Sequence, residues 1–94
     1  MIKIVRNDKN ITIEGHANFS DTNDIVCASV SSIMYTTVNA ILNFDEDAIN
    51  FEDDKKKVII TIKKEDDITN KLIDNMMLMF DSLKKDYPSN IEIK

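Results

Sequence analysis

One cysteine and one histidine, Cys27 and His16, are separated by ten intervening residues and could act as a nucleophile and its base. They are the only cysteine and the only histidine in the chain. A thiolate can attack a carbonyl carbon, while an imidazole within hydrogen-bond reach takes the thiol proton and later passes it to the leaving group. The alternative is that Cys27 is a small buried residue and His16 a polar strand-end residue. Two soft ligands are too few for a closed zinc site, so we expect no metal.

The residues around Cys27 predict where its thiol lies. Asp24 is a good N-cap, and the apolar spacing from Ile25 predicts a helix that runs to about Asn43. Cys27 is then the third helical residue, close to the unpaired N–H groups and the positive dipole end of the first turn. This position favours the thiolate form and offers first-turn amides as donors to an oxyanion.

Two polar side chains near Cys27 could support the pair. Ser31 lies four residues further along the same helix face, where its hydroxyl could hold the His16 ring in one tautomer. The Ser31 hydroxyl could equally bond back to the carbonyl of Cys27. Asp24 could act only as the helix cap or could also stabilise the protonated imidazole. The sequence leaves both alternatives open.

Alternating and helical spacings predict the elements that position these residues. Strands are expected at 1–6, 11–14, 49–51, 58–62 and 91–93, and helices at 25–43 and from Asp66 or Asp67 to just before Pro88. Gly15 ends the second strand, where a residue without Cβ permits an unusual dihedral or a close approach by another chain. The order β-β-α-β-β-α-β predicts a single α+β domain over residues 1–94. It has two layers, a mixed, mostly antiparallel sheet with two helices packed on one face.

Apolar residues at helical spacing predict the buried face of each helix. The first stripe is Val26, Val30, Ile33, Val38, Ile41 and Leu42, and the second is Ile68, Leu72, Ile73, Met76, Phe80 and Leu83. The run 76–80 is methionine-rich, and such a run is more typical of core than of a binding face. Because it is apolar on more than one side, part of it could form a dimer contact.

The composition excludes some classes of partner. Acidic residues outnumber basic ones by 17 to 12, for a net charge of −5, and Arg6 is the only arginine. The lysine runs 55–57 and 63–64 lie beside acidic runs, so we expect no direct nucleic-acid binding. No apolar run approaches the roughly 20 residues of a membrane span, and we expect no membrane association. A single free thiol indicates a reducing, cytoplasmic setting.

The segment Gly15-His16-Ala17, followed by Asp24-Ile25-Val26-Cys27-Ala28-Ser29-Val30-Ser31, resembles the ribosomal-processing cysteine protease (Prp) family. The resemblance implies a thiol protease without a cofactor. It implies removal of the N-terminal extension of a large-subunit ribosomal protein precursor, of the bacterial bL27 type, during ribosome biogenesis. In that family pattern Cys27 is the nucleophile, His16 the base and Ser31 the residue that orients His16, and Asp24 also falls on a motif position. A homodimer is implied as well.

The loop between His16 and Cys27 is implied by the same resemblance to be a mobile lid over the substrate. Asn18, Phe19 and Ser20 are the predicted lid and substrate-contacting residues. Family members often carry glycine at the position of Asn18 and a tyrosine-like residue at that of Phe19. Asparagine still tolerates left-handed backbone, so we expect a lid that works with less freedom.

Two other functions remain open from the sequence. The main alternative is a non-catalytic protein that binds a ribosomal protein or nascent chain during ribosome assembly, for which Cys27→Ala would leave cellular activity intact. A thiol-based redox sensor is the weaker alternative, because the chain has no second cysteine to resolve an oxidised Cys27.

Overall fold

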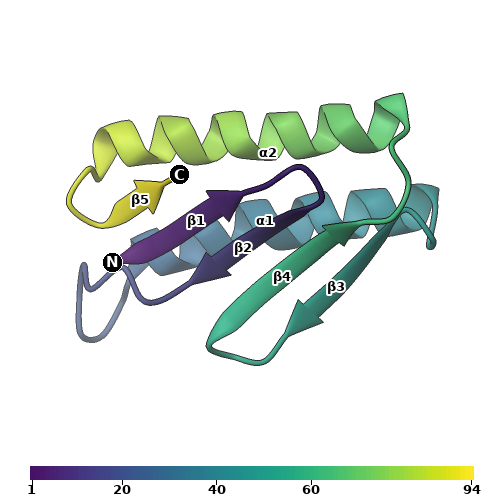
Figure 1. The fold of residues 1–94 in the computed structure, drawn as a ribbon. Helices are drawn as coiled ribbons and strands as arrows, with labels where there is room; N and C mark the ends of the chain where they lie inside the picture. The colour runs from purple at the N-terminus through teal and green to yellow at the C-terminus, as the bar shows by residue number, and fades with distance from the viewer.

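The computed structural model describes residues 1–94 as a five-stranded sheet with two helices on one face (Figure 1). The elements are β1 (Ile2–Arg6), β2 (Asn10–Glu14), α1 (Ile25–Phe44), β3 (Ile49–Asp53), β4 (Lys57–Ile62), α2 (Asp67–Asp86) and β5 (Ile91–Ile93). The strand order across the sheet is β3-β4-β2-β1-β5. All neighbouring strands are antiparallel except β1 and β5, which are parallel. The predicted fold class and element order are confirmed.

The core lies between the sheet and the helices, and alternating isoleucines of the strands form its sheet side. Ile4 pairs with Ile13 across β1 and β2, and Ile11 pairs with Ile60 across β2 and β4. All four side chains are buried, whereas the residues between them point to the other face of the sheet. They belong to one cluster of 17 buried hydrophobic residues that also includes the inner faces of both helices.

The buried face of α1 differs in part from the predicted stripe. Val26, Val30, Val38 and Ile41 are buried as predicted, whereas Ile33 and Leu42 are only partly buried. The stripe also includes Met34 and Thr37. The hydroxyl of Thr37 donates to the carbonyl of Ile33 at 2.9 Å, and this local hydrogen bond lets a polar residue lie in the core.

The predicted face of α2 is wrong at Ile68, which is 45% exposed. Thr69 is fully buried instead, and both its N–H and its hydroxyl donate to the N-cap Asp66, at 2.7 and 3.0 Å. The cap therefore turns Thr69 inward and Ile68 outward. The rest of that face is Ile73, Met76 and Phe80, which are buried, and Leu72 and Leu83, which are partly buried.

The methionine-rich run of α2 is divided between core and surface. Met76 and Phe80 are buried, but Leu78 is 66% exposed and Met79 is 48% exposed. The prediction that the run mainly serves the core therefore holds for one side of the helix only. Its other side is an exposed apolar surface.

Helix α1 is long and apolar enough to cross a membrane by length and composition, with a mean hydropathy of 1.6. The expectation that no apolar run approaches that length is therefore wrong for this helix. Core helices pass the same test, and Val26, Val30 and Ile41 of α1 are buried against the rest of the fold. One third of that span is buried, so packing within the domain accounts for the apolar character of this part of α1.

Candidate active site

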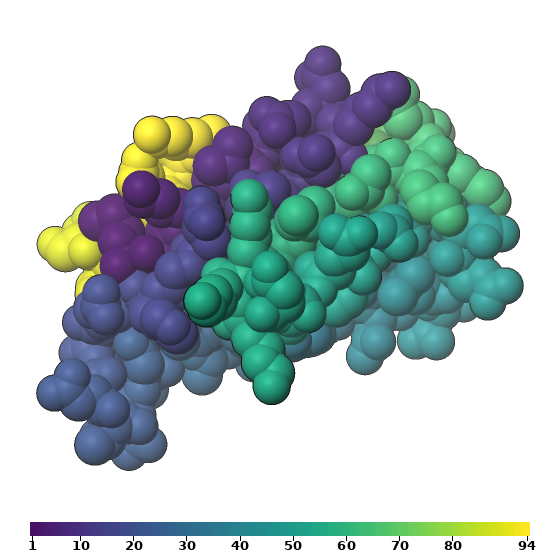
Figure 2. All heavy atoms as spheres, turned by 60° about the horizontal axis from the view of Figure 1, so that its bottom comes forward, coloured from purple at the N-terminus to yellow at the C-terminus, as the bar shows by residue number.

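His16 and Cys27 line one groove of about 360 Å³ between the first half of α1 and the ends of β2 and β4. Figure 2 shows the loop before α1 and the β3–β4 hairpin as two projections on either side of a hollow over this part of α1. His16 is exposed and Cys27 is half-buried. No hydrogen bond joins the two side chains. The structure brings the two predicted chemical groups into one groove.

Cys27 is the third residue of α1, as the sequence predicts, because Asp24 caps the helix. The sulfur of Cys27 accepts a hydrogen bond from the backbone N–H of Ala17, with an N–S distance of 3.3 Å. Ala17 directly follows His16 and is 1% exposed. The backbone beside His16 is therefore held against the thiol.

The carboxylate of Asp24 uses both oxygens for backbone N–H groups. Its Oδ1 accepts from Val26 at 3.1 Å and from Cys27 at 3.0 Å, and its Oδ2 accepts from Phe19 at 3.1 Å. The Cys27 N–H above all, with the Phe19 and Val26 N–H groups and the Cys27 thiol, holds the pKa of Asp24 below its ordinary value against the opposing effect of desolvation. Asp24 thus caps α1 and ties down the preceding loop, and it makes no hydrogen bond to His16.

The expectation of free first-turn amides is wrong at the residues nearest the sulfur. The N–H groups of Val26 and Cys27 donate to the Asp24 side chain, and that of Ala28 donates to the Asp24 carbonyl at 3.1 Å. An N-cap satisfies the donors that an isolated helix leaves open. These amides are therefore already occupied before any substrate binds.

Ser31 lines the same groove and is exposed. Its hydroxyl bonds neither to His16 nor back to the carbonyl of Cys27, so neither predicted alternative is observed. Ser29, two residues earlier, does bond back, donating to the carbonyl of Ile25 at 2.7 Å. The Ser31 hydroxyl remains available to a group that enters the groove.

Two residues give the segment around His16 its backbone shape. Gly15 has φ of +91°, and a Cβ there would overlap the carbonyl oxygen of Met1. The unusual dihedral predicted for this glycine is confirmed, whereas the close approach comes from Met1 of the same chain. Asn18 has φ of +57°, so it adopts the left-handed backbone expected of it.

The other predicted lid residues make contacts within the fold. Phe19 is 46% exposed, and its ring packs edge-on against Tyr87, which follows α2. The hydroxyl of Ser20 accepts from the N–H groups of Thr22 and Asn23, at 3.3 and 3.4 Å. Ser20 therefore shapes the loop itself.

Sequence reasoning missed Asn90, in the turn between α2 and β5. Its side-chain N–H donates to the carbonyl of Ala17 at 2.8 Å, across 73 residues of sequence. The short segment Pro88–Asn90 has the composition of an ordinary turn, which carries no signal for a distant contact. Only the pairing of β5 with β1 brings Asn90 to this place.

Tyr35 marks the far end of the groove. Its hydroxyl donates to Asp53 at 2.6 Å, and its ring meets that of Phe51 edge-on at 5.8 Å. These contacts join α1 to the β3–β4 hairpin, whose residues 55–57 also line the groove. The hydrogen bond to Asp53 raises the pKa of Tyr35 and, by the same interaction, lowers that of Asp53.

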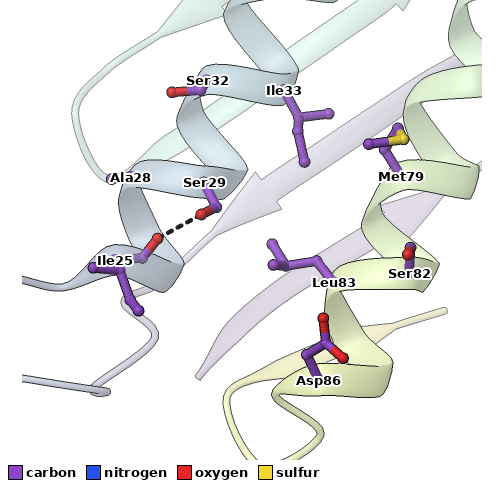
Figure 3. A pocket seen from close by; sticks show the side chains of 9 residues that line it. All are labelled: Ile25, Ala28, Ser29, Ser32, Ile33, Met79, Ser82, Leu83 and Asp86. Atoms are coloured by element: carbon purple, nitrogen blue, oxygen red, sulfur yellow. Dashed lines mark hydrogen bonds between the residues drawn. The ribbon is translucent and has the colours of Figure 1, made fainter.

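A second groove of about 580 Å³ lies between α1 and α2 and contains neither His16 nor Cys27 (Figure 3). Ile33 and Leu83 project into it from the two helices, and Asp86 lies at one end. No group of three or more histidine, cysteine or acidic side chains is arranged to hold a metal ion. The chemistry-bearing side chains are therefore in the first groove.

The fold and the groove that His16 and Cys27 share define a small α+β domain with a helix-start thiol and an imidazole in one groove. Residues 1–92 match the family described as cysteine protease Prp, and the chain belongs to that family. It is a cysteine protease.

Relatives of known structure agree with this assignment. The ribosomal processing cysteine protease Prp of Staphylococcus aureus is 25% identical over 87 residues, which cover 88% of this chain and 82% of that protein. A crystal structure of S. aureus Prp with a covalently linked product peptide has a TM-score of 0.82 at 25% identity, covering 99% of this chain and 95% of that one. A Streptococcus mutans protein has the same fold, with a TM-score of 0.72 at 19% identity over 99% and 90% of the two chains.

Proposed function

We propose that this protease removes the N-terminal extension of a large-subunit ribosomal protein precursor of the bL27 type, using Cys27 and His16. Family membership and the name of the S. aureus relative support the substrate class. The main observation in support of the Cys27 and His16 pair is the position of the Cys27 sulfur. It accepts a hydrogen bond from the N–H of the residue next to His16, and both side chains line one groove.

The reaction follows from this pair. His16 takes the thiol proton, and the Cys27 thiolate attacks the scissile carbonyl carbon, so that a C–S bond forms and the carbonyl π electrons move to oxygen. When the tetrahedral intermediate collapses, the C–N bond breaks and His16 gives the proton to the leaving amine. Water then hydrolyses the thioester and restores the thiol. Ser31, which lines the same groove, would orient the imidazole while it carries the proton.

An extended, hydrophobic peptide suits this groove. Its lining includes Ile2, Ile13, Val30, Met34 and Val58. The groove is open, so a peptide could lie in it along the first half of α1. Phe19, on the loop before α1, has a half-exposed ring that would cover apolar side chains of the substrate. A groove of this size favours recognition along the peptide over a single deep pocket.

The remaining proposals concern setting and assembly. The net charge of −5 and the single arginine support a peptide substrate without direct nucleic-acid binding. The free thiol supports a cytoplasmic location. The exposed Leu78 and Met79 support a homodimer that covers this side of α2. Leu78→Glu should then convert a dimer to a monomer in sedimentation, whereas Asn39→Glu, an exposed change on α1, should not.

The test of function is mass spectrometry of the host's precursor ribosomal protein after incubation with wild-type protein, Cys27→Ala and His16→Ala. Cleavage at one N-terminal site by the wild type alone supports the proposal. Ser31→Ala should slow cleavage, while Ser32→Ala, its matched neighbour outside the groove, should leave the rate unchanged.

Two outcomes contradict the proposal. Equal cleavage by all three proteins means that another site or a contaminant is responsible. No cleavage of a precursor that carries an extension favours the alternative of a non-catalytic ribosome-assembly protein.

A further inference from the structure

The peptide groups of Ala17 are held from two sides. Its N–H donates to the Cys27 sulfur at 3.3 Å, and its carbonyl accepts from the Asn90 side chain at 2.8 Å. Ala17 is almost completely buried, so water does not compete for these groups. The N–H next to the nucleophile is therefore fixed in direction before a substrate arrives.

Attack by the thiolate requires a donor for the oxygen that becomes negatively charged. The N–H groups of the first helical turn nearest the sulfur are already engaged, because those of Val26, Cys27 and Ala28 are bonded to Asp24. A useful donor must lie close to the sulfur, since the oxyanion forms on the carbon that the sulfur attacks. The Ala17 N–H meets this condition.

The Ala17 N–H also has a weak ground-state partner. Sulfur is a poor hydrogen-bond acceptor, whereas an oxyanion is a strong one. As the C–S bond forms and the carbonyl electrons move to oxygen, the sulfur loses its negative charge and the oxygen gains it. The oxyanion, which forms on the carbon bonded to the sulfur, can then replace the sulfur as the acceptor of this fixed N–H, at the donor distance of about 2.7–3.1 Å. The stronger hydrogen bond to oxygen therefore stabilises the transition state and not the ground state.

Asn90 is built to hold this donor. Its own N–H donates to the carbonyl of Tyr87 at 3.1 Å, and its carbonyl accepts from Ile2 at 2.9 Å. The Asn90 backbone is thus fixed to both the α2–β5 turn and the start of β1. Because the Ala17 carbonyl can only accept, the Asn90 amide must present its NH₂ group.

We propose that the Ala17 N–H is the oxyanion donor of this protease and that Asn90 is the positioning residue that directs it. The proposal rests on the proposed Cys27 and His16 chemistry. It adds a residue from the far end of the chain to the machinery of the reaction.

The first experiment compares Asn90→Asp and Asn90→Ala with wild type. Aspartate has nearly the same shape but lacks the NH₂ donor, and Ser89→Asp is the control for added charge on an exposed neighbour. We expect kcat for a precursor peptide to fall about 10- to 100-fold in both Asn90 variants. The KM should change by less than about threefold, because the lost interaction belongs to the transition state.

Alkylation of Cys27 by iodoacetamide separates this role from others. That reaction displaces iodide at a saturated carbon and forms no oxyanion, so its rate reports the thiolate and its access alone. We expect the Asn90 variants to be alkylated at the wild-type rate. A fall in alkylation parallel to the fall in kcat overturns the proposal, because the Ala17 N–H would then serve only the thiolate.

A second experiment removes the N–H itself and does not depend on how the Asn90 variants fold. Cys27 is a native ligation junction, so a synthetic fragment of residues 1–26 can be joined to the rest of the chain. An ester in place of the Ala17 amide N–H should lower kcat about 10²- to 10³-fold. An ester at Asp8, in the turn between β1 and β2, is the matched control, because the Asp8 N–H donates no hydrogen bond and the Asn7 carbonyl accepts none.

The outcomes distinguish the two proposals. Cleavage that is insensitive to Asn90 and to the Ala17 ester overturns this inference and leaves the proposed function intact. Failure of the wild type to cleave any precursor peptide overturns the proposed function, and this inference with it.

Discussion

The ring of Phe19 meets the ring of Tyr87 edge-on, with centroids 5.3 Å apart and planes at 83°. This contact joins the loop before α1 to the residue that directly follows α2. The backbone N–H of Phe19 is held separately by Asp24. The predicted lid is therefore attached to the body of the domain at its aromatic residue.

Tyr87→Ala should loosen the loop and raise the KM for a precursor peptide. An aromatic pair of this geometry contributes about 0.5–1.5 kcal/mol, which corresponds to roughly a 2- to 12-fold change in affinity. Tyr87→Phe keeps the ring and should behave like wild type. Steady-state cleavage kinetics give the measurement, and equal defects in the two variants would contradict the role of the ring contact.

Gly15→Ala should destabilise the protein. The left-handed backbone at this position costs a residue with a side chain about 1–2 kcal/mol, and the overlap with the Met1 carbonyl adds to that cost. Urea unfolding followed by circular dichroism measures the loss. The neighbouring exposed residue Glu14, changed to Ala, is the control. An unchanged midpoint in Gly15→Ala would mean that the loop relaxes without strain.

Asp24→Asn should alter how stability depends on pH. Folding lowers the pKa of Asp24, so its carboxylate stabilises the folded state above the ordinary pKa of an aspartate. This contribution is lost as the pH falls through the lower folded-state pKa. The difference in free energy of unfolding between wild type and Asp24→Asn should therefore be largest above about pH 5 and shrink towards pH 2.

Urea unfolding at several pH values tests this dependence. Asp21→Asn, an exposed loop carboxylate whose side chain makes no hydrogen bond, should follow the wild-type profile. A constant difference between wild type and Asp24→Asn from pH 7 to pH 2 would show that the charge of Asp24 is not linked to folding.

His16→Ala should slow alkylation of Cys27 at pH 6. If the imidazole stabilises the thiolate, its removal should lower the rate about tenfold or more under mildly acidic conditions. The difference should vanish near pH 10, where thiols are ionised without help. Thr22→Ala, an exposed change in the same loop, is the control. Equal rates at pH 6 would remove His16 from the role of base.

Much of the local structure follows from short-range patterns in the sequence. The N-cap at Asp24, the third helical position of Cys27 and the left-handed backbone of Gly15 and Asn18 depend on residues only a few positions apart. Caps, turn preferences and the 2- and 3.6-residue periods act over such distances. The order of strands and helices and the family motif can likewise be recognised from short stretches of sequence.

The competition between neighbours was harder to predict. Helical spacing places Ile68 and Thr69 equally near the core, and the pair of hydrogen bonds from Thr69 to Asp66 decides which one is buried. The first-turn amides are likewise claimed by Asp24. In both places an aspartate side chain accepts hydrogen bonds from backbone N–H groups, and the spacing of apolar residues does not predict such bonds.

The sequence by itself determined the two helices, the strands, and the presence of one thiol, Cys27, and one imidazole, His16, as the reactive pair. Only the tertiary structure decided that Asn90 and Tyr87 reach the segment between His16 and Cys27. The parallel pairing of β5 with β1 carries the end of the chain back to its beginning. Ala17 and Asn90, 73 positions apart, meet because the strands assemble in the order that buries their isoleucines. No local sequence pattern predicts this contact.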